Sequence, residues 1–197
     1  MTKTKSDYMD NFMDEDGVKA VEATEAAQME GGFWIRRSER GDLETLLKLR
    51  DAAREIMRQS GNMKQWPERV PARELFERDI ARGESFVCMG TDGRPCATFA
   101  MIGGPDPTYA RVVRGTGWSD EETPYMVVHR LASDGSHKGV LKAVLGFIRA
   151  RSGHIRIDTH EDNGIMRHLL TREGFNCVGT IFLANGEERL AYEWIKR

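Results

Sequence analysis

The stretch from Thr123 to Leu141, TPYMVVHRLASDGSHKGVL, has residue types and spacing that suit the binding of an anion. An apolar segment leads into a turn with Gly135 and Gly139, and a helix is expected to begin at about Lys138. The first N–H groups of a helix have no intrahelical partner and carry partial positive charge. Glycine lets the backbone approach a ligand closely, and Lys138 adds a cation. The pattern predicts a cradle for a diphosphate; an ordinary strand–helix connection is the alternative.

The elements around this stretch follow an order that predicts a mixed sheet. Strands are expected at 33–37, 85–89, 94–102, about 125–132, 154–158, 175–183 and 187–195. Helices are expected to begin near Asp42, Pro71, Lys138 and Asp162 or Asn163. Residues 103–107 interrupt the pattern, and 108–122 form an excursion of ambiguous structure. The chain order β-α-α-β-β-β-α-β-α-β-β predicts an α/β (α+β) domain, with a mostly antiparallel twisted sheet of about seven strands and helices on both faces.

The overall composition bears on several classes of function. The 197 residues, 40% of them hydrophobic, are enough for one domain with a sizeable core. The net charge of -2 gives no basis for a surface that binds nucleic acid or membrane, and no apolar run approaches the roughly 20 residues of a membrane helix. The N-terminus lacks the apolar core of a secretory signal. Three cysteines without metal-ligand spacing predict no metal site and fit a reducing cytoplasm.

Residues 1–32 are expected to form an acidic tail that precedes a domain at 33–197. The tail contains three Lys and eight Asp or Glu, a net charge of -5, so the remainder carries +3, which is -2 minus -5. Few bulky apolar residues and the closing Gly31-Gly32 predict disorder. A weak helix between Gly17 and Met29, or docking on the domain or on a neighbouring chain, is the alternative.

Between about Trp34 and Trp194 the chain resembles the GNAT superfamily of acetyl-CoA-dependent N-acyltransferases. In that family, a strand–loop–helix placed like the segment from Tyr125 to Val140 binds the pyrophosphate of CoA. The segment from Asn163 to Phe175 is similar to the family's pattern of an Asn, a helix and Gly-Phe. The segments HRLASDG, RIDTHEDN and GEERLAYE resemble a bacterial GNAT group whose members are often uncharacterised.

The chain differs from the family in two functional motifs, the phosphate loop and the position of the proton donor. The family's phosphate loop reads Gln or Arg, two residues, Gly, one residue, Gly or Ala. Aligned on Gly139, this chain has Ser136 at the first position and Leu141 at the last. Many members protonate the departing thiolate with a Tyr seven residues after the Asn, where this chain has Leu170. CoA binding is therefore expected through backbone amides, and the usual proton donor is absent.

The resemblance implies that acetyl-CoA is the co-substrate and that the family's fourth and fifth strands splay apart to admit it. Pantetheine is then expected along the backbone of Leu131, Ala132 and Ser133, with an N–H near Leu131 polarising the thioester carbonyl. Asn163 is expected to contact this ligand and is equally suited to cap its helix. The diphosphate is expected on the loop formed by Ser136, His137, Lys138, Gly139 and Val140.

A base is expected at the opening between the strands, because an amine that is protonated at neutral pH must lose a proton before it attacks. His160, Asp158 and His129 come from the ends of the two strands, and His160 or Asp158 is favoured. A turn-capping role for Asp158 and a structural role for His129 are the alternatives. Trp66 and Trp118 are expected to form an aromatic wall for the acceptor, with burial in the core as the alternative.

The function expected from this resemblance is N-acetyl transfer to a primary amine of a small molecule or peptide, without a covalent enzyme intermediate. No nucleic-acid, membrane or metal partner is expected, and a homodimer is an open alternative. A GNAT-like module that binds acyl-CoA as a sensor or scaffold without turnover is the second hypothesis. An interaction domain that binds no CoA is the third, because a fold does not determine a function.

Overall fold

The computed structural model describes residues 26–197, and the predictions for residues 1–25 lie outside this part of the chain. Its strands are β1 (Ala27–Gln28), β2 (Trp34–Arg37), β3 (Ser85–Met89), β4 (Pro95–Gly103), β5 (Met126–Ser133), β6 (His154–Thr159), β7 (Asn176–Phe182) and β8 (Glu188–Ile195). Its α-helices are α2 (Leu43–Gln59), α3 (Arg73–Ala81), α4 (Val140–Arg149) and α5 (Gly164–Arg172). Short 3-10 helices are η2 (Glu30–Gly32), η3 (Arg40–Asp42) and η4 (Pro107–Tyr109).

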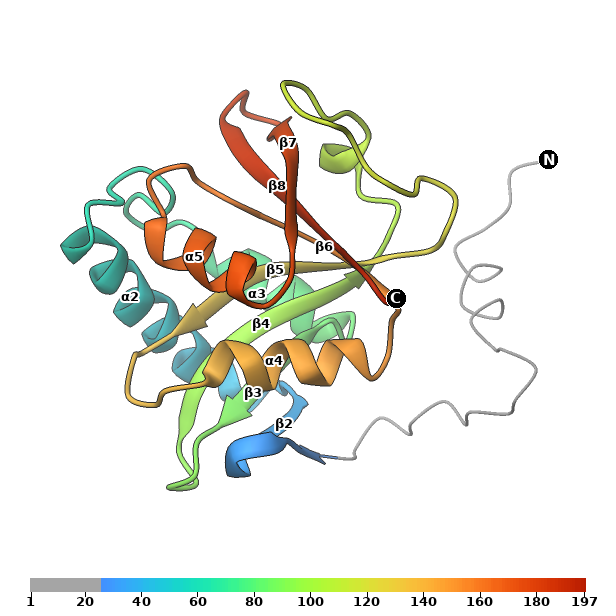
Figure 1. Ribbon diagram of the computed structural model, residues 1–197. Coiled ribbons are helices and arrows are strands. Elements are labelled where there is room, and N and C mark those ends of the chain that lie inside the picture. Colours follow the sequence, from blue (N-terminus) through green and yellow to red (C-terminus); the bar gives the residue numbers. More distant parts are fainter. Residues whose placement is uncertain (1–25) are drawn as a thin grey trace.

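The strands form one sheet in the order β1-β2-β3-β4-β5-β6-β8-β7 (Figure 1). Neighbouring strands are antiparallel except β5 and β6, which are parallel. The predicted mixed, mostly antiparallel sheet is therefore confirmed. It has eight strands in the described residues, not about seven, because the two-residue β1 pairs with β2 at one edge.

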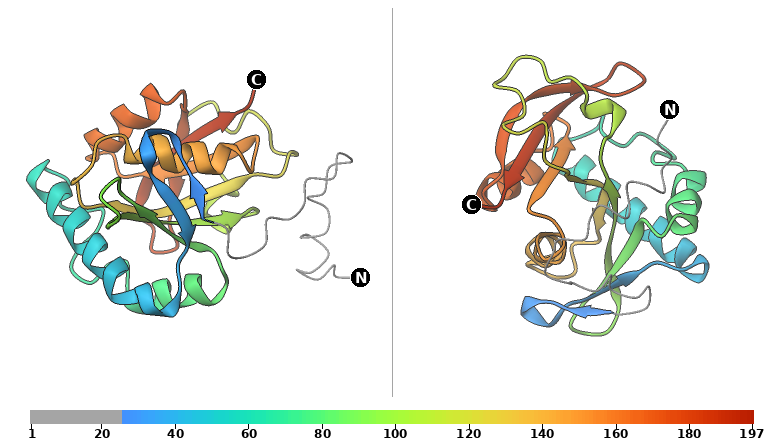
Figure 2. Two further views of the ribbon diagram at one scale, coloured as in Figure 1. Left: turned by 90° about the horizontal axis from the view of Figure 1, so that it is seen from below. Right: turned by 90° about the vertical axis from the view of Figure 1, so that its right-hand side faces the viewer.

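Helices cover both faces of the sheet, as predicted (Figure 2). On one face, Leu46 and Leu47 of α2 and Phe76 of α3 pack with Val87 of β3. On the other face, α4 buries seven of its ten residues in the main core, and Leu170 of α5 joins the same core. Within residues 26–197, no helix combines the length and apolar character needed to cross a bilayer.

Two predicted helix starts move by two residues. The helix expected at about Lys138 begins at Val140, because Gly139 at the N-cap adopts a left-handed conformation with φ 85°. The helix expected to hold Pro71 in its first turn begins at Arg73, with extended backbone at Ala72. The Asn185-Gly186 turn does join β7 and β8, and Gly186 has the positive φ of 82° that favours glycine there.

Residues 27–32, assigned from the sequence to the acidic tail, are attached to the sheet. Gln28 and Ala27 pair with Trp34 and Ile35 of β2, and Met29 packs against the main core. Glu30 forms an ion pair of 2.8 Å with Lys142 of α4. Backbone pairing and the burial of one methionine thus hold this segment on the domain, which corresponds to the docking alternative for these residues.

The excursion between β4 and β5 lies against the edge of β7. Val113 forms an antiparallel bridge with Thr180, and the N–H of Gly117 donates to the carbonyl of Val178. The approach is so close that a Cβ at Gly115 would overlap the carbonyl oxygen of Val178. This long loop, residues 104–125, is therefore held against the sheet by backbone hydrogen bonds. Its side chains reach the region between β5 and β6.

The parallel pair β5–β6 is joined over only part of its length. Its register covers residues 126–128 of β5 against residues 155–157 of β6 and stops there. On its other side β5 remains paired with β4 as far as Ser133, across a bulge in which Arg130 and Leu131 face the single residue Phe99. Arg130 takes φ 54° in this bulge, a positive value that is uncommon outside glycine. Beyond Val128, β5 therefore diverges from β6, which leaves an opening in the middle of the sheet.

Candidate active site

A cavity of about 340 Å³ lies at the opening between β5 and β6. The two strands, the α2–α3 connection, the 104–125 loop, helix α5 and the β7–β8 hairpin all contribute to its wall. The lining residues are Gln65, Trp66, Val70, Asp106, Thr108, Val128, His129, Arg130, Leu131, Ile157, Asp158, Thr159, Met166, Leu183 and Arg189. Segments far apart in the sequence thus meet where the sheet is interrupted.

Four side chains in and beside this cavity form a connected polar group. His129 Nε2 lies 2.9 Å from Asp106 Oδ2, and His129 Nδ1 lies 3.9 Å from Asp158 Oδ1. The hydroxyl of Tyr109 donates to Asp158 Oδ1 at 2.7 Å. Trp118 donates from its indole N–H to the carbonyl of Tyr109, which fixes the tyrosine from the side remote from the cavity. The imidazole therefore stands between two carboxylates, each held by its own partner.

The ionisation of Asp106 follows from its partners. Burial disfavours the charged carboxylate, but the hydrogen bonds from His129 and from Thr108 outweigh it and lower the pKa of Asp106 to about 2. Asp106 is thus an acceptor at neutral pH, and the ring nitrogen that faces it, Nε2, carries the proton in a neutral imidazole. This leaves Nδ1, the nitrogen that faces Asp158, with a free lone pair. Burial and the Asp158 carboxylate raise the pKa of Tyr109, so the phenol stays protonated.

The two sides of the cavity differ in chemistry because strand residues alternate in direction. Val128, Leu131, Ile157 and Met166 belong to, or pack against, the core beneath α4 and α5. His129 packs against Tyr109 on the other side, with a ring separation of 5.9 Å. The cavity is apolar on the α4–α5 side and has an imidazole with two carboxylates on the α2–α3 side.

The loop that precedes α4 has two glycines with positive φ, Gly135 at 76° and Gly139 at 85°. A Cβ at Gly139 would have no neighbour closer than 4.0 Å, so the backbone there is open. The carboxylate of Asp134, however, accepts from both the N–H and the hydroxyl of Ser136 at 2.9 and 2.6 Å. The N–H of Ser136 is therefore engaged within the loop, whereas the first turn of α4, which begins at Val140, has the unpaired N–H groups of a helix start.

No protein-family model matches the sequence, and no curated protein matches it significantly. Solved structures do match. A GNAT family acetyltransferase from Streptococcus agalactiae 2603 is 28% identical with a TM-score of 0.77, and the match covers 86% of this chain and 98% of that one. The chain has the GNAT acetyltransferase fold. A GNAT family acetyltransferase from Listeria monocytogenes 4b F2365 (18%, TM-score 0.60) and a ribosomal-protein-S5-alanine acetyltransferase from Vibrio fischeri (16%, TM-score 0.54) share this fold; each match covers 87% of this chain and, respectively, 99% and 97% of the other.

On the GNAT fold, the residues predicted to hold CoA fall into two groups. Leu131, Ala132 and Ser133 lie in the part of β5 that has parted from β6, with Leu131 lining the cavity. The loop from Ser136 to Val140 lies farther along the chain, at the start of α4. Within that loop the side chain of His137 turns to the β3–β4 hairpin, where its Nε2 lies 3.6 Å from Asp92. Its predicted contact with a ligand can therefore come only from its backbone in this conformation.

Both polar atoms of the Asn163 side chain have a hydrogen-bond partner within the protein. Its Oδ1 accepts from the N–H of Met166 at 3.1 Å, so it caps α5, and its Nδ2 donates to Gln65 Oε1 at 2.9 Å. Gln65 Oε1 also accepts from the Asn62 side chain at 2.9 Å, from the Thr159 hydroxyl at 3.3 Å and more weakly from the N–H of His160 at 3.4 Å. One amide oxygen thus joins the α2–α3 connection to the end of β6 and to the start of α5.

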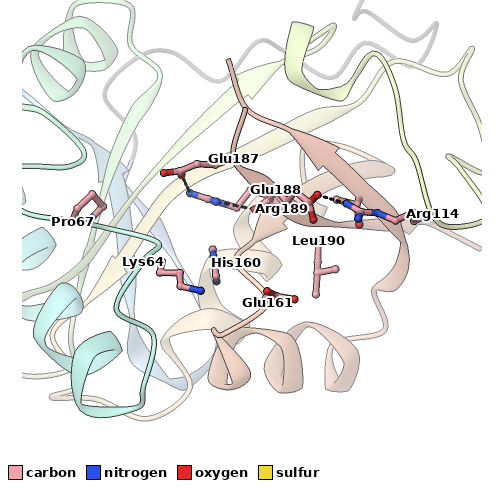
Figure 3. Close-up of a pocket in the computed structure, with 10 residues that line it drawn as sticks. Lys64, Pro67, Arg114, His160, Glu161, Glu187, Glu188, Arg189 and Leu190 are labelled. Carbon is pink, nitrogen blue, oxygen red and sulfur yellow. Dashed lines mark hydrogen bonds and ion pairs between the residues drawn. The ribbon is translucent and has the colours of Figure 1, made fainter. Parts of the chain in front are cut away.

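Of the three base candidates, Asp158 and His129 line the cavity between the strands, and His160 lines a neighbouring one (Figure 3). That second cavity, of about 570 Å³, lies between the α2–α3 connection and the start of β8. His160 faces it because β6 ends at Thr159, and its Nδ1 accepts from the N–H of Asp162 at 3.1 Å. The structure therefore separates His160 from the pair formed by His129 and Asp158.

The two tryptophans predicted to face the acceptor occupy different places. Trp66 lines the cavity and packs on Ala53, Met57 and Ala132. Trp118 packs on Tyr109 with a ring separation of 5.5 Å and under the guanidinium of Arg156, on the far side of the polar group. Leu170, at the position where many GNAT proteins have Tyr, is completely buried in the main core.

Asp106, Gln65 and the hydroxyl of Tyr109 are the site residues that the sequence did not point to. Asp106 stands in the segment GGPDP, which reads only as an interruption between strands. A carboxylate held between two prolines directly after a strand was the available signal. Its partner His129 is 23 residues away, and only the return of the 104–125 loop brings them together.

Proposed function

We propose that this protein is an N-acetyltransferase that moves the acetyl group of acetyl-CoA to a primary amine by direct attack. The observation that carries the proposal is the opening between β5 and β6, which has an apolar side and, opposite it, a His129–Asp106 pair that faces Asp158. The fold is that of proteins described as acetyltransferases. An opening through the sheet lets the thioester and the amine enter from opposite faces, with one base at their meeting point.

The co-substrate is assigned to the α4–α5 side of the opening. Pantetheine would lie along the free edge of β5 from Leu131 to Ser133, since those backbone groups have no β6 partner in the register. The diphosphate would bind at the start of α4, where Gly139 leaves the backbone open and Lys138 supplies a cation. A backbone N–H at Leu131 would polarise the thioester carbonyl.

The amine is assigned to the side of His129. A protonated amine is attracted by Asp158 and transfers one proton to His129 Nδ1, whose lone pair faces that carboxylate. The free amine then attacks the carbonyl carbon, so that a C–N bond forms and the C–S bond breaks with its electron pair on sulfur. His129 donates the proton on Nδ1 to the departing thiolate, then accepts the second proton from the nitrogen and releases it to solvent, which gives an amide and free CoA thiol. His129 thereby serves in place of the tyrosine that Leu170 replaces.

A matched pair of glycine variants tests the cofactor side. Gly139 and Gly186 both have positive φ, 85° and 82°, and neither has a neighbour closer than 4.0 Å to an added Cβ. Gly139→Asp places a carboxylate where the diphosphate is assigned and should abolish the thermal stabilisation by CoA, whereas Gly186→Asp should retain it. Equal stabilisation of both variants would contradict the assignment of the loop.

Release of free thiol from acetyl-CoA in the presence of amines tests the reaction itself. Amine-dependent release that depends on His129 supports the transferase. A second function, binding of acyl-CoA without turnover, is favoured by the complete burial of Leu170 at the usual acid position. Stabilisation by CoA without thiol release from any of a broad set of amines would support that function and overturn the first.

A further inference from the structure

The amine side of the opening has an excess of negative charge. Asp106 and Asp158 line it with side chains 17% and 13% exposed. The two arginines in the wall are already committed to other partners. Arg130 Nε lies 2.6 Å from Asp79, and Arg189 Nη2 lies 2.7 Å from Glu187. Even with His129 protonated, the amine would meet one more negative than positive charge that is available to it.

This charge selects against a carboxylate next to the amine. An amine bound between His129 and Asp158 has its own carbon within a few ångströms of the Asp158 oxygens. A carboxylate on that carbon would face Asp106 and Asp158 in a partly buried site, where repulsion is screened far less than in water. Arg130 and Arg189 each form an ion pair, with Asp79 and Glu187, so neither adds an uncompensated positive charge that would offset this repulsion.

The mouth of the same cavity is apolar. Trp66 and Val70 enter from the α2–α3 connection, and Leu183 enters from the turn between β7 and β8. The residue Val70 is 41% exposed, so its side chain is accessible to a ligand at the cavity. The body of the acceptor would therefore leave the carboxylates and pass between an indole and two aliphatic side chains.

The neighbouring 570 Å³ cavity has no excess charge that would attract a charged part of the acceptor (Figure 3). Four of its charged side chains form two ion pairs, Arg114 with Glu188 and Arg189 with Glu187. Lys64 lies 3.8 Å from Asp162. The charges in that cavity are thus largely compensated, whereas those at the opening are not.

We propose that the acceptor is a primary amine with an apolar, preferably aromatic, body and no carboxylate on the carbon that bears the amine. This inference rests on the proposed function and adds the class of its substrate. It assigns specificity to Trp66, Val70 and Leu183 at the mouth and to Asp106 and Asp158 at the base of the cavity.

A matched pair of acceptors tests the charge rule. 2-Phenylethylamine and phenylalanine have the same body and differ in the carboxylate beside the amine. We expect kcat/KM for phenylalanine to be roughly 100-fold lower in thiol release from acetyl-CoA. Phenylalanine amide, which restores the size without the charge, should recover most of the loss. Equal rates with phenylalanine and 2-phenylethylamine would overturn the rule.

A second pair tests the apolar mouth. Trp66→Ala should lower the ratio of kcat/KM for 2-phenylethylamine to that for ethylamine by about tenfold, since only the larger amine reaches the mouth. The ratio cancels any change in the folded fraction. Trp34→Ala, which removes a 44% exposed tryptophan from β2, should leave the ratio unchanged. An unchanged ratio in Trp66→Ala would contradict the assignment.

Equilibrium binding separates this inference from the transferase proposal. Titration calorimetry of 2-phenylethylamine and of phenylalanine into the protein in the presence of CoA requires no turnover. Preferential binding of 2-phenylethylamine without thiol release would retain the substrate class and overturn the reaction. Thiol release with amines such as spermidine or glycine in preference to 2-phenylethylamine would retain the reaction and overturn the class.

Discussion

Two histidine–carboxylate pairs in this molecule have the same geometry and different surroundings. His129 Nε2 lies 2.9 Å from Asp106 Oδ2, and His154 Nε2 lies 2.9 Å from Glu193 Oε1. The His129 side chain is 19% exposed and lines the opening between β5 and β6, whereas that of His154 is 1% exposed. The histidine–carboxylate distance therefore does not distinguish the roles of the two pairs. What distinguishes them is whether the second ring nitrogen of the imidazole is engaged by the protein.

His154 has no ring nitrogen left for chemistry. Its Nδ1 lies 3.3 Å from the carbonyl oxygen of Thr123, and Glu193 also accepts from the N–H and the hydroxyl of Ser119. Arg156 lies beside the same carboxylate, with Nε 3.6 Å away. This buried group fastens the end of the 104–125 loop to β6 and β8. His129, in contrast, leaves Nδ1 facing the cavity, which is the requirement for a base.

The largest expected effect separates the two histidines by activity. His129→Gln should lower kcat/KM for the best amine by about 100-fold to 10,000-fold, the usual contribution of a general base, with little change in melting temperature. His154→Gln is the matched variant and should act mainly on stability. Kinetics of thiol release and thermal unfolding of both variants measure the difference. Comparable losses of activity per folded molecule would contradict the assignment of a catalytic role to His129 and a structural role to His154.

The next effect concerns stability. Glu193→Gln removes a charge that is 1% exposed and leaves Arg156 and His154 without their counter-ion, so we expect a loss of about 3 kcal/mol in the free energy of unfolding. Urea denaturation measures it. Glu44→Gln, which breaks an exposed ion pair with Arg73, should cause no measurable change. A Glu193 variant as stable as the Glu44 variant would contradict a structural role for the buried pair.

A smaller effect depends on pH. The pKa of Asp106 is about 2 in the folded protein, below the ordinary aspartate value of 3.8 expected for the unfolded chain, so the folded state favours the ionised carboxylate. The resulting stabilisation, about 2 kcal/mol, is present above about pH 4 and is lost as the pH falls to about 2. The difference in unfolding free energy between the wild type and Asp106→Asn should shrink over that interval. A difference that stays constant from about pH 5 to about pH 2 would contradict the low pKa.

The smallest expected effect is that of a third pair. His160 Nδ1 lies 3.5 Å from Asp162 and faces the neighbouring cavity. His160→Gln should change kcat/KM by less than about threefold, because the base is assigned to His129 and His160 faces the neighbouring cavity. A loss comparable to that in His129→Gln would return the base role to His160.

The fold could be predicted because its signals are local. The apolar run around Val127 and the helical spacing of the residues after Gly139 each depend on neighbours in the chain, and the Asn185-Gly186 turn needs only two residues. The start of α4 moved from Lys138 to Val140 because the left-handed backbone of Gly139 delays the helix, a property that spacing does not encode.

The site could be predicted only in part, because its members are brought together by loops. Asp158 and His160 are two residues apart, which favours one shared site, yet the end of β6 at Thr159 opens them to separate cavities. Asp106 reaches His129 only because the 104–125 loop is seated on β7 and held by Glu193. Such contacts depend on packing between segments that are distant in the sequence, so the spacing of residues in the sequence does not predict them.

The amide oxygen of Gln65 is a contact through which the two halves of the opening would be coupled. It accepts a hydrogen bond from Asn163 at the start of α5, on the side proposed for the co-substrate, and belongs to the same connection as Trp66, on the side proposed for the acceptor. A ligand that draws Asn163 away from Gln65 loosens that connection and alters the affinity for the other ligand. By reciprocity, the second ligand changes the affinity for the first by the same factor.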